Sequence, residues 1–182
     1  MPRRIAFLRA INVGGHNVKM DELKSLFAAL GFGGVETFIA SGNVIFDAEG
    51  DAVELEARIE RQLRESLGYE VATFLRTPAE VADVAACEPF AAAEPGTAEV
   101  QAVSVGFTRR APGDEARERA MTLQTATDAF HLRGRELYWA CRTRVSDSKI
   151  TNARLEKALG MPATFRNVTT VRKLAAKYAP GA

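Results

Sequence analysis

Metal-binding and membrane-spanning features are scarce in this chain. Its 182 residues include two cysteines, Cys87 and Cys141, and two histidines, His16 and His131. The cysteines lie far apart and form no CxxC pair, so the supply of thiolate and imidazole ligands for a metal is poor. No apolar run approaches the roughly 18 residues that a membrane span needs. The sequence therefore predicts a reduced, cytoplasmic protein with no metal, no cofactor and no membrane partner.

An export signal is missing as well. The chain begins MPRRIAFLRAINVGG, in which basic residues precede an apolar run as they do in signal peptides. That run is short, Arg9 interrupts it, and no small-residue cleavage site follows. We therefore expect no export.

The net charge of +1 hides an uneven distribution along the chain. Residues 1–20 hold four basic residues and no acidic one, and residues 133–182 hold 11 basic and three acidic residues. The segment between them is acidic, with 9 basic and 20 acidic residues. Two interpretations stay open: an anionic partner binds where the basic ends meet, or each charge lies on a solvated face.

The hydrophobic pattern of the first half predicts a β-α-β-β-α-β order. Gly31 and Gly68 stand where helices end, and Asp51 with Glu54 forms a helix-starting cap. Gly42 and Asn43 tolerate positive φ and predict a tight hairpin. The expected elements are a strand at 4–11, a helix at 20–30, strands at 35–39 and 44–47, a helix at 51–67 and a strand at 69–76.

The second half repeats this order without a visible sequence repeat. Thr77, Pro78 and Glu80 open a first helix. The expected elements that follow are a strand at 99–107, a helix at 114–123, strands at 129–132 and 136–141, a helix at 149–159, a short strand at 163–166 and a helix at 168–179. We therefore predict an α+β fold of two ferredoxin-like (βαββαβ) subdomains, at 1–76 and 77–182. Each subdomain has an antiparallel sheet with helices on one face.

Four segments carry a family resemblance: LRAINVGGHNVKM, ETFIASGNVIFD, SKITNARLEKALG and ATFRNVTTVRKL. They resemble the uncharacterised bacterial family called domain of unknown function 1697, over a span from Arg9 to Leu174. The resemblance implies a pair of ferredoxin-like subdomains and no established activity. This chain departs from the family pattern at Ala10, where the family usually has Gly. It departs again at Val168 and Thr169, where the family has Trp and Asn.

The predicted topology groups the polar loops. In a ferredoxin-like sheet the strands are antiparallel, in spatial order 4-1-3-2. The loop after the first strand and the 41–43 hairpin then share one end of the first sheet, whereas Arg76 lies at the opposite end. In the second half the same reasoning places 147–149 and 166–167 at one common end. Whether these two ends face each other is left open by the sequence.

These ends suit anion binding. Backbone N–H groups of Gly14 and Gly15, with Arg9 and Lys19, are suited to a phosphate. The run lacks the spacing of a P-loop and of GxGxxG. The alternative is that the glycines only make a turn, the asparagines satisfy turn backbone and the lysine is solvated. The candidate ligand-binding residues are Arg9, Asn12, Gly14, Gly15, Lys19, Ser41, Gly42, Asn43, Lys149, Arg166 and Asn167.

Other reactive side chains are better explained by structure. Ser148 next to Lys149 is predicted to be a helix N-cap rather than a nucleophile, since adjacent helical residues do not face each other. His16 is expected to be an exposed loop histidine. Both cysteines are expected to be small core residues. Of Tyr138 and Trp139, alternation leaves one facing outward, and core packing is favoured for that residue as well.

Three functions remain. The first is binding of a phosphorylated ligand, either a nucleotide or a nucleic-acid backbone. Sequence-specific RNA reading is not expected, because the chain has no aromatic run such as GFGFV. The second is an enzyme acting on a small anionic substrate, for which no nucleophile or base stands out. The third is a protein-interaction module.

Overall fold

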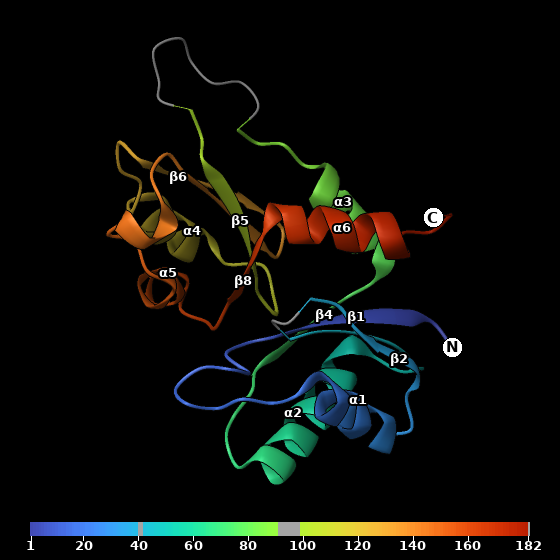
Figure 1. The fold of residues 1–182 in the computed structure, drawn as a ribbon. Coiled ribbons are helices and arrows are strands. Elements are labelled where there is room, and N and C mark those ends of the chain that lie inside the picture. Colours follow the sequence, from blue (N-terminus) through green and yellow to red (C-terminus); the bar gives the residue numbers. More distant parts are fainter. Residues whose placement is uncertain (40–41, 91–98, 182) are drawn as a thin grey trace. The chain divides into compact units, whose positions relative to one another are not determined.

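The structure is a computed structural model that describes residues 1–39, 42–90 and 99–181. The chain divides into two compact units (Figure 1). The first unit is Met1–Val81 together with Lys177–Ala182, and the second is Ala82–Ala176. Among the described residues, no helix is both long and apolar enough to cross a membrane.

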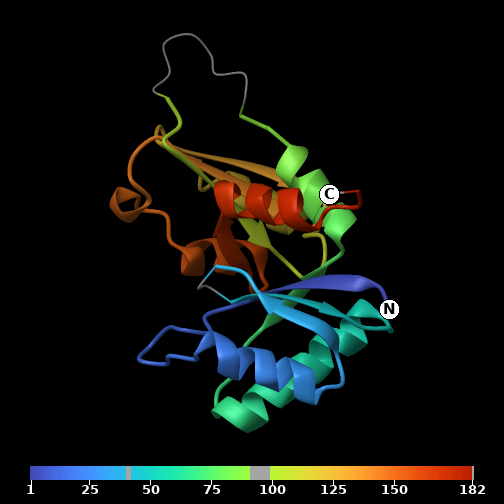
Figure 2. The same cartoon turned by 45° about the vertical axis from the view of Figure 1, so that its right-hand side comes forward.

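The first unit has the predicted βαββαβ order. Its four antiparallel strands lie in the order β2-β3-β1-β4, which is the expected spatial order 4-1-3-2. Figures 1 and 2 show helices α1 and α2 on one face of this sheet. The elements are β1 (Arg3–Leu8), α1 (Met20–Ala29), β2 (Gly33–Thr37), β3 (Asn43–Asp47), α2 (Ala52–Leu67) and β4 (Thr73–Arg76).

Local signals explain the ends of α2. The carboxylate of Asp51 accepts a hydrogen bond from the Val53 N–H at 2.8 Å, which caps the first turn. Gly68 ends the helix in the left-handed conformation, at φ 82°. Strand β1 is shorter than predicted and ends at Leu8. Ile11 is nevertheless buried, because it packs in the core as a loop residue.

The second unit repeats the order with its own sheet. Its strands lie antiparallel in the order β6-β7-β5-β8, so the α+β class is confirmed for the whole chain. Helix α3 begins in the last residues of the first unit's main segment, where a capping box joins Thr77 and Glu80 as predicted. The elements are α3 (Pro78–Ala86), β5 (Ala102–Phe107), α4 (Asp114–Met121), β6 (Asp128–Arg133), β7 (Glu136–Cys141), a 3-10 helix (Val145–Asp147), α5 (Asn152–Leu159), β8 (Thr164–Asn167) and α6 (Val168–Tyr178).

The second sheet is covered on both faces. Trp139 of β7 packs with Leu155 of α5 and Ala120 of α4 in one core cluster. The neighbouring Tyr138 points to the other face, where its hydroxyl donates to the Val84 carbonyl of α3 at 3.1 Å. Helices α3 and α6, which precede and follow the βαββαβ order, lie side by side in Figures 1 and 2. Both aromatic residues are therefore buried, which confirms their predicted core role.

Two edge strands have their outward backbone groups occupied by side chains. On β4, the N–H groups of Thr73 and Leu75 donate to the carboxylates of Glu60 and Glu56, both at 2.9 Å. On β6, the Phe130 N–H donates to Gln124 Oε1 at 3.2 Å. Further along β6, the Leu132 carbonyl accepts from Arg117 at 3.1 Å. These contacts satisfy polar groups that a sheet edge otherwise leaves exposed.

Candidate functional site

The loop between β1 and α1 starts with two backbone anchors. The Leu8 N–H donates to the Gly42 carbonyl and the Arg9 N–H donates to the Ala72 carbonyl, both at 2.9 Å. Next, Ala10 adopts a left-handed φ of 56°, which glycine tolerates better than alanine. The loop thus leaves β1 beside the β2–β3 hairpin, and the structure brings these two segments together as the topology predicts.

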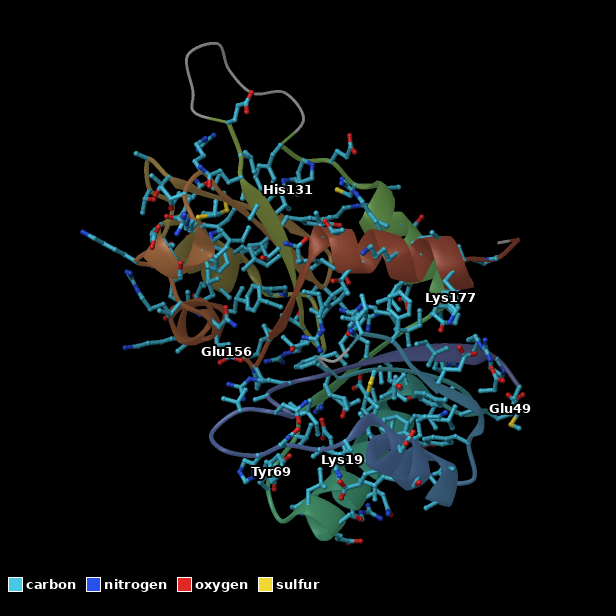
Figure 3. The ribbon with its side chains drawn as sticks, viewed as in Figure 1. Lys19, Glu49, Tyr69, His131, Glu156 and Lys177 are labelled. Atoms are coloured by element: carbon cyan, nitrogen blue, oxygen red, sulfur yellow. The ribbon has the colours of Figure 1, made fainter. Side chains whose placement is uncertain are left out.

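Three side-chain contacts then hold residues 11–18 in place. Asn12 Oδ1 accepts the Val18 N–H at 2.8 Å, and the Tyr69 hydroxyl donates to the Ile11 carbonyl at 2.7 Å. The imidazole of His16 stacks on the Tyr69 ring, with 3.7 Å between centroids and 20° between planes. Figure 3 labels Tyr69 and Lys19, which lie on the same side of the first unit. We refer to residues 9–19 and Tyr69 as the loop end.

The electrostatics of the loop end are mixed. Burial, with a smaller contribution from the carboxylate of Glu22, raises the pKa of Tyr69, so its hydroxyl stays a donor at neutral pH. Lys19 is exposed at the N-cap of α1, where its side chain makes no capping bond. Asp21 and Glu22 occupy the first turn of that helix and offset part of the positive charge.

The glycines of this region have different roles. Gly14 and Gly15 adopt φ values of 68° and 86°, and a Cβ added at either position would meet no atom within 4 Å. Both residues are exposed, and the position that a side chain would take at each faces open space. Gly42, at φ 75°, is packed instead: a Cβ there would lie 2.8 Å from Ile11 Cγ2. Gly42 is required so that the hairpin can approach the loop.

Two further site residues were predicted in the β2–β3 hairpin of the first unit, Asn43 and Ser41. Asn43 is fully buried, and its amide donates to the Phe38 carbonyl at 2.9 Å. Asn12 and Asn43 thus both satisfy turn backbone, as the structural alternative predicts. Ser41 lies outside the described residues.

In the second unit, the predicted residues share one end of the sheet but lie at opposite edges. Ser148, next to Lys149, bonds to β6, whereas Arg166 and Asn167 belong to β8. Two strands separate β6 from β8, which corresponds to about 14 Å. Lys149 and Arg166 therefore belong to opposite edges of the sheet, and their joint binding of one anion stays a prediction.

Arg166 is largely enclosed. Its side chain is 8% exposed, and burial lowers its pKa to about 10. Its Nη1 donates to Thr164 Oγ1 and to the Phe165 carbonyl, both at 2.9 Å. Asn167 accepts the Thr169 N–H at 2.8 Å and caps the start of α6. Lys149 is exposed.

A buried carboxylate that the sequence reasoning missed lies at this end. Asp128 Oδ1 and Oδ2 accept four side-chain hydrogen bonds, from Ser148 at 2.7 Å, Trp139 at 2.9 Å, Thr125 at 2.8 Å and Thr127 at 2.9 Å. Burial acts to raise the pKa of Asp128, but these hydrogen bonds outweigh it, so the pKa lies below its ordinary value of 3.8. Asp128 thereby fixes the loop that carries Lys149.

This network corrects the prediction for Ser148. Helix α5 begins at Asn152 rather than at Lys149, and Thr151 Oγ1 is its N-cap, accepting the Arg154 N–H at 3.2 Å. Ser148 is not a helix cap, because its hydroxyl donates to Asp128 and accepts the Ile150 N–H. The nearby motif Thr125-x-Thr127-Asp128 is the signal that could have suggested this cluster.

A solved structure of another bacterial protein has a similar fold. The conserved bacterial protein SP0830 from Streptococcus pneumoniae has a solved structure that resembles this one with a TM-score of 0.75. The two chains are 22% identical, and the similarity covers 98% of each, so the comparison shows a shared fold. No curated protein matches the chain.

The family assignment rests on the sequence. The family described as "Protein of unknown function (DUF1697)" matches residues 1–138. This range contains the first two of the four segments that carry the resemblance, LRAINVGGHNVKM and ETFIASGNVIFD. The predicted resemblance is confirmed, and the chain belongs to the DUF1697 family of proteins of unknown function.

Proposed function

We propose that the loop end of the first unit binds a nucleotide unit, either free or within a nucleic-acid strand. The observation that carries this proposal is the exposed imidazole of His16, held by stacking on Tyr69. Arg9 and Lys19 bracket the same loop. An aromatic surface beside basic side chains is the combination that binds single-stranded nucleic acid without sequence preference.

Each part of a nucleotide has a matching group here. A base stacks on the outer face of His16, extending the His16–Tyr69 pair, and such stacking contributes about 1–3 kcal/mol per base. The phosphate contacts Lys19 and Arg9, with exposed backbone from Gly14 and Gly15 available as donors. The acidic first turn of α1 weakens the attraction, and with two phosphate contacts we expect a modest dependence on ionic strength.

The test is binding of a fluorescent single-stranded oligonucleotide and of adenosine monophosphate, measured across a salt series. Two phosphate contacts predict a slope of about −1.4 in log K against log salt for a single strand. Lys19→Ala should halve that slope, and His16→Ala should weaken binding at every salt concentration. Lys24→Ala and His131→Ala, which alter exposed residues elsewhere, are the matched controls.

The alternatives give different results. An enzyme acting on a small anionic substrate would show phosphatase, esterase or transferase turnover that Lys19→Ala abolishes. The proposed function would be refuted if neither the oligonucleotide nor adenosine monophosphate bound at low salt. It would also be refuted if both His16→Ala and Lys19→Ala bound the probes as the native chain does.

A protein partner is the second candidate ligand of this end. Val13 at the tip of the loop is 62% exposed, and Ile39 in the neighbouring hairpin is 43% exposed. Exposed apolar side chains indicate docking of another protein when they form one contiguous patch. A partner recovered by the native chain and lost with Val13→Asp, but kept with Lys19→Ala, would support this function over nucleotide binding.

A further inference from the structure

A tight turn at the tip of the loop end presents His16. The His16 N–H donates to the Val13 carbonyl at 3.4 Å, which closes the turn. Its two central residues, Gly14 and Gly15, both have positive φ, as in the mirror-image turns. The backbone of this turn is bonded to itself, and the imidazole is stacked on Tyr69. His16 therefore keeps a defined position although the residue is exposed.

The stack on Tyr69 suits a positively charged imidazole. The two ring centroids are 3.7 Å apart and the ring planes differ by 20°. A cation over the face of a tyrosine ring, within about 6 Å of its centroid, is attracted by the ring quadrupole. Burial, and then the carboxylate of Glu22, raise the pKa of Tyr69, so this ring stays neutral. A proton on His16 is therefore compatible with the stack.

The fixed charges around the stack are balanced. They belong to Arg9 and Lys19 of the loop, Asp21 and Glu22 of α1, and Arg64 and Glu70 on either side of Gly68 and Tyr69. The two cations of the loop oppose a further positive charge, whereas the two acids of α1 favour it. Arg64 and Glu70 pair with each other at 3.4 Å. A proton on the imidazole thus adds a net positive charge to the loop end.

We propose that His16 makes nucleic-acid binding at the loop end pH-dependent, with tighter binding in acid. This inference rests on the proposed function, because it concerns the same site. Imidazole is the side chain that ordinarily changes its charge between pH 5 and 8. The proton comes from solvent and leaves the stack in place. The imidazolium is then a third cation, beside Arg9 and Lys19, for the phosphates of a strand.

The same change discriminates between the two ligands of the proposed function. The phosphodiester groups of a strand keep their single charge throughout this pH range, whereas a phosphate monoester changes its charge at about pH 6. As the pH falls, a strand gains a contact with the imidazolium, while a free nucleotide loses part of its own charge. The loop end should therefore favour a single strand over a free nucleotide in acid.

The test measures binding of a dye-labelled oligothymidylate without a terminal phosphate, across a salt series at about pH 8 and about pH 5.5. The native chain should bind about three- to fivefold more tightly at the lower pH, the size of one solvated charge interaction. One added phosphate contact should steepen the slope of log K against log salt by about 0.7, from about −1.4 to about −2.1. Adenosine monophosphate should not show this gain.

Two substitutions of His16 fix the charge at this position. His16→Phe provides a stacking ring that takes no proton, so its affinity should be the same at both pH values. His16→Arg provides a planar cation at both pH values, so its slope should be about −2.1 at each. His131→Phe is the matched control, because His131 is an exposed histidine of β6 in the second unit (Figure 3), and it should keep the native response.

The proposed function and this inference fail in different ways. Absence of binding at both pH values would overturn both. Binding by the native chain with the same affinity and slope at both pH values would overturn the inference alone. A pH response that persists in His16→Phe, or a slope that still steepens in acid in His16→Arg, would do the same, because the titrating group would then lie elsewhere.

Discussion

Replacing Asp128 with alanine should destabilise the second unit by about 3 kcal/mol. The change leaves the indole N–H of Trp139 buried without its acceptor, and an unsatisfied buried donor costs about 1–3 kcal/mol. The lost charge-assisted bond from Ser148 adds about 1 kcal/mol. The hydroxyls of Thr125 and Thr127 can turn toward water, so their loss adds little. Asp128→Asn keeps an acceptor and should cost less than half as much.

The assay is urea unfolding followed by tryptophan fluorescence. Trp139 is the single tryptophan of the chain and bonds directly to Asp128, so its emission reports on the second unit. Asp147→Asn, at an exposed carboxylate in the same loop region, is the control and should stay within about 0.5 kcal/mol. A cost below about 1 kcal/mol for Asp128→Ala would show that the four hydrogen bonds do not hold the loop.

The same carboxylate predicts a pH dependence. Its pKa is lower in the folded chain than the ordinary 3.8, so the stabilisation is complete above that value. It is lost as the pH falls below 3.8 and through the folded-state pKa. The stability difference between the native chain and Asp128→Asn should therefore shrink in acid. A difference that stays constant down to the acid transition would contradict the role of the charged form.

Three further variants test other features of the fold. Ala10→Gly should stabilise the first unit slightly, by up to about 1 kcal/mol in thermal unfolding, because it relieves the left-handed alanine; destabilisation would contradict this. Gly106→Ala should cost about 1–3 kcal/mol by denaturant unfolding, since its Cβ would lie 2.6 Å from the Phe165 ring; a neutral effect would mean that the ring moves freely. Tyr69→Phe should cost about 1 kcal/mol by losing the bond to Ile11 while keeping the stack, and nucleotide binding, measured by fluorescence, should survive.

The parts of the fold that local signals determine were predictable. Asp51 and Gly68 mark the start and the end of α2 as predicted, because capping depends on residues a few positions apart. The strand order followed from the element order. The extent of β1 was not predictable, because Ile11 is as buried as a strand residue while lying in a loop.

The candidate site was harder to predict because its contacts are long-range. Tyr69 lies 58 residues from Ile11, whose carbonyl accepts its hydroxyl hydrogen bond. No residue near His16 in the sequence indicates that His16 stacks on Tyr69. Ser148 looked like a cap because its partner, Asp128, is 20 residues away. Cys141 is buried as predicted, whereas Cys87 is only partly buried, a difference that no local sequence signal indicates.

The side chains along the outer edges of β4 and β6 limit how this protein can associate. A strand from another molecule that tried to extend either sheet would have to displace Glu56 and Glu60, or Gln124 and Arg117, from the backbone groups they occupy. At these two edges the sheets are therefore poor templates for growth into a continuous ribbon. At the β4 and β6 edges, a partner or a second copy of the chain has to recognise side chains instead of adding backbone to the sheet.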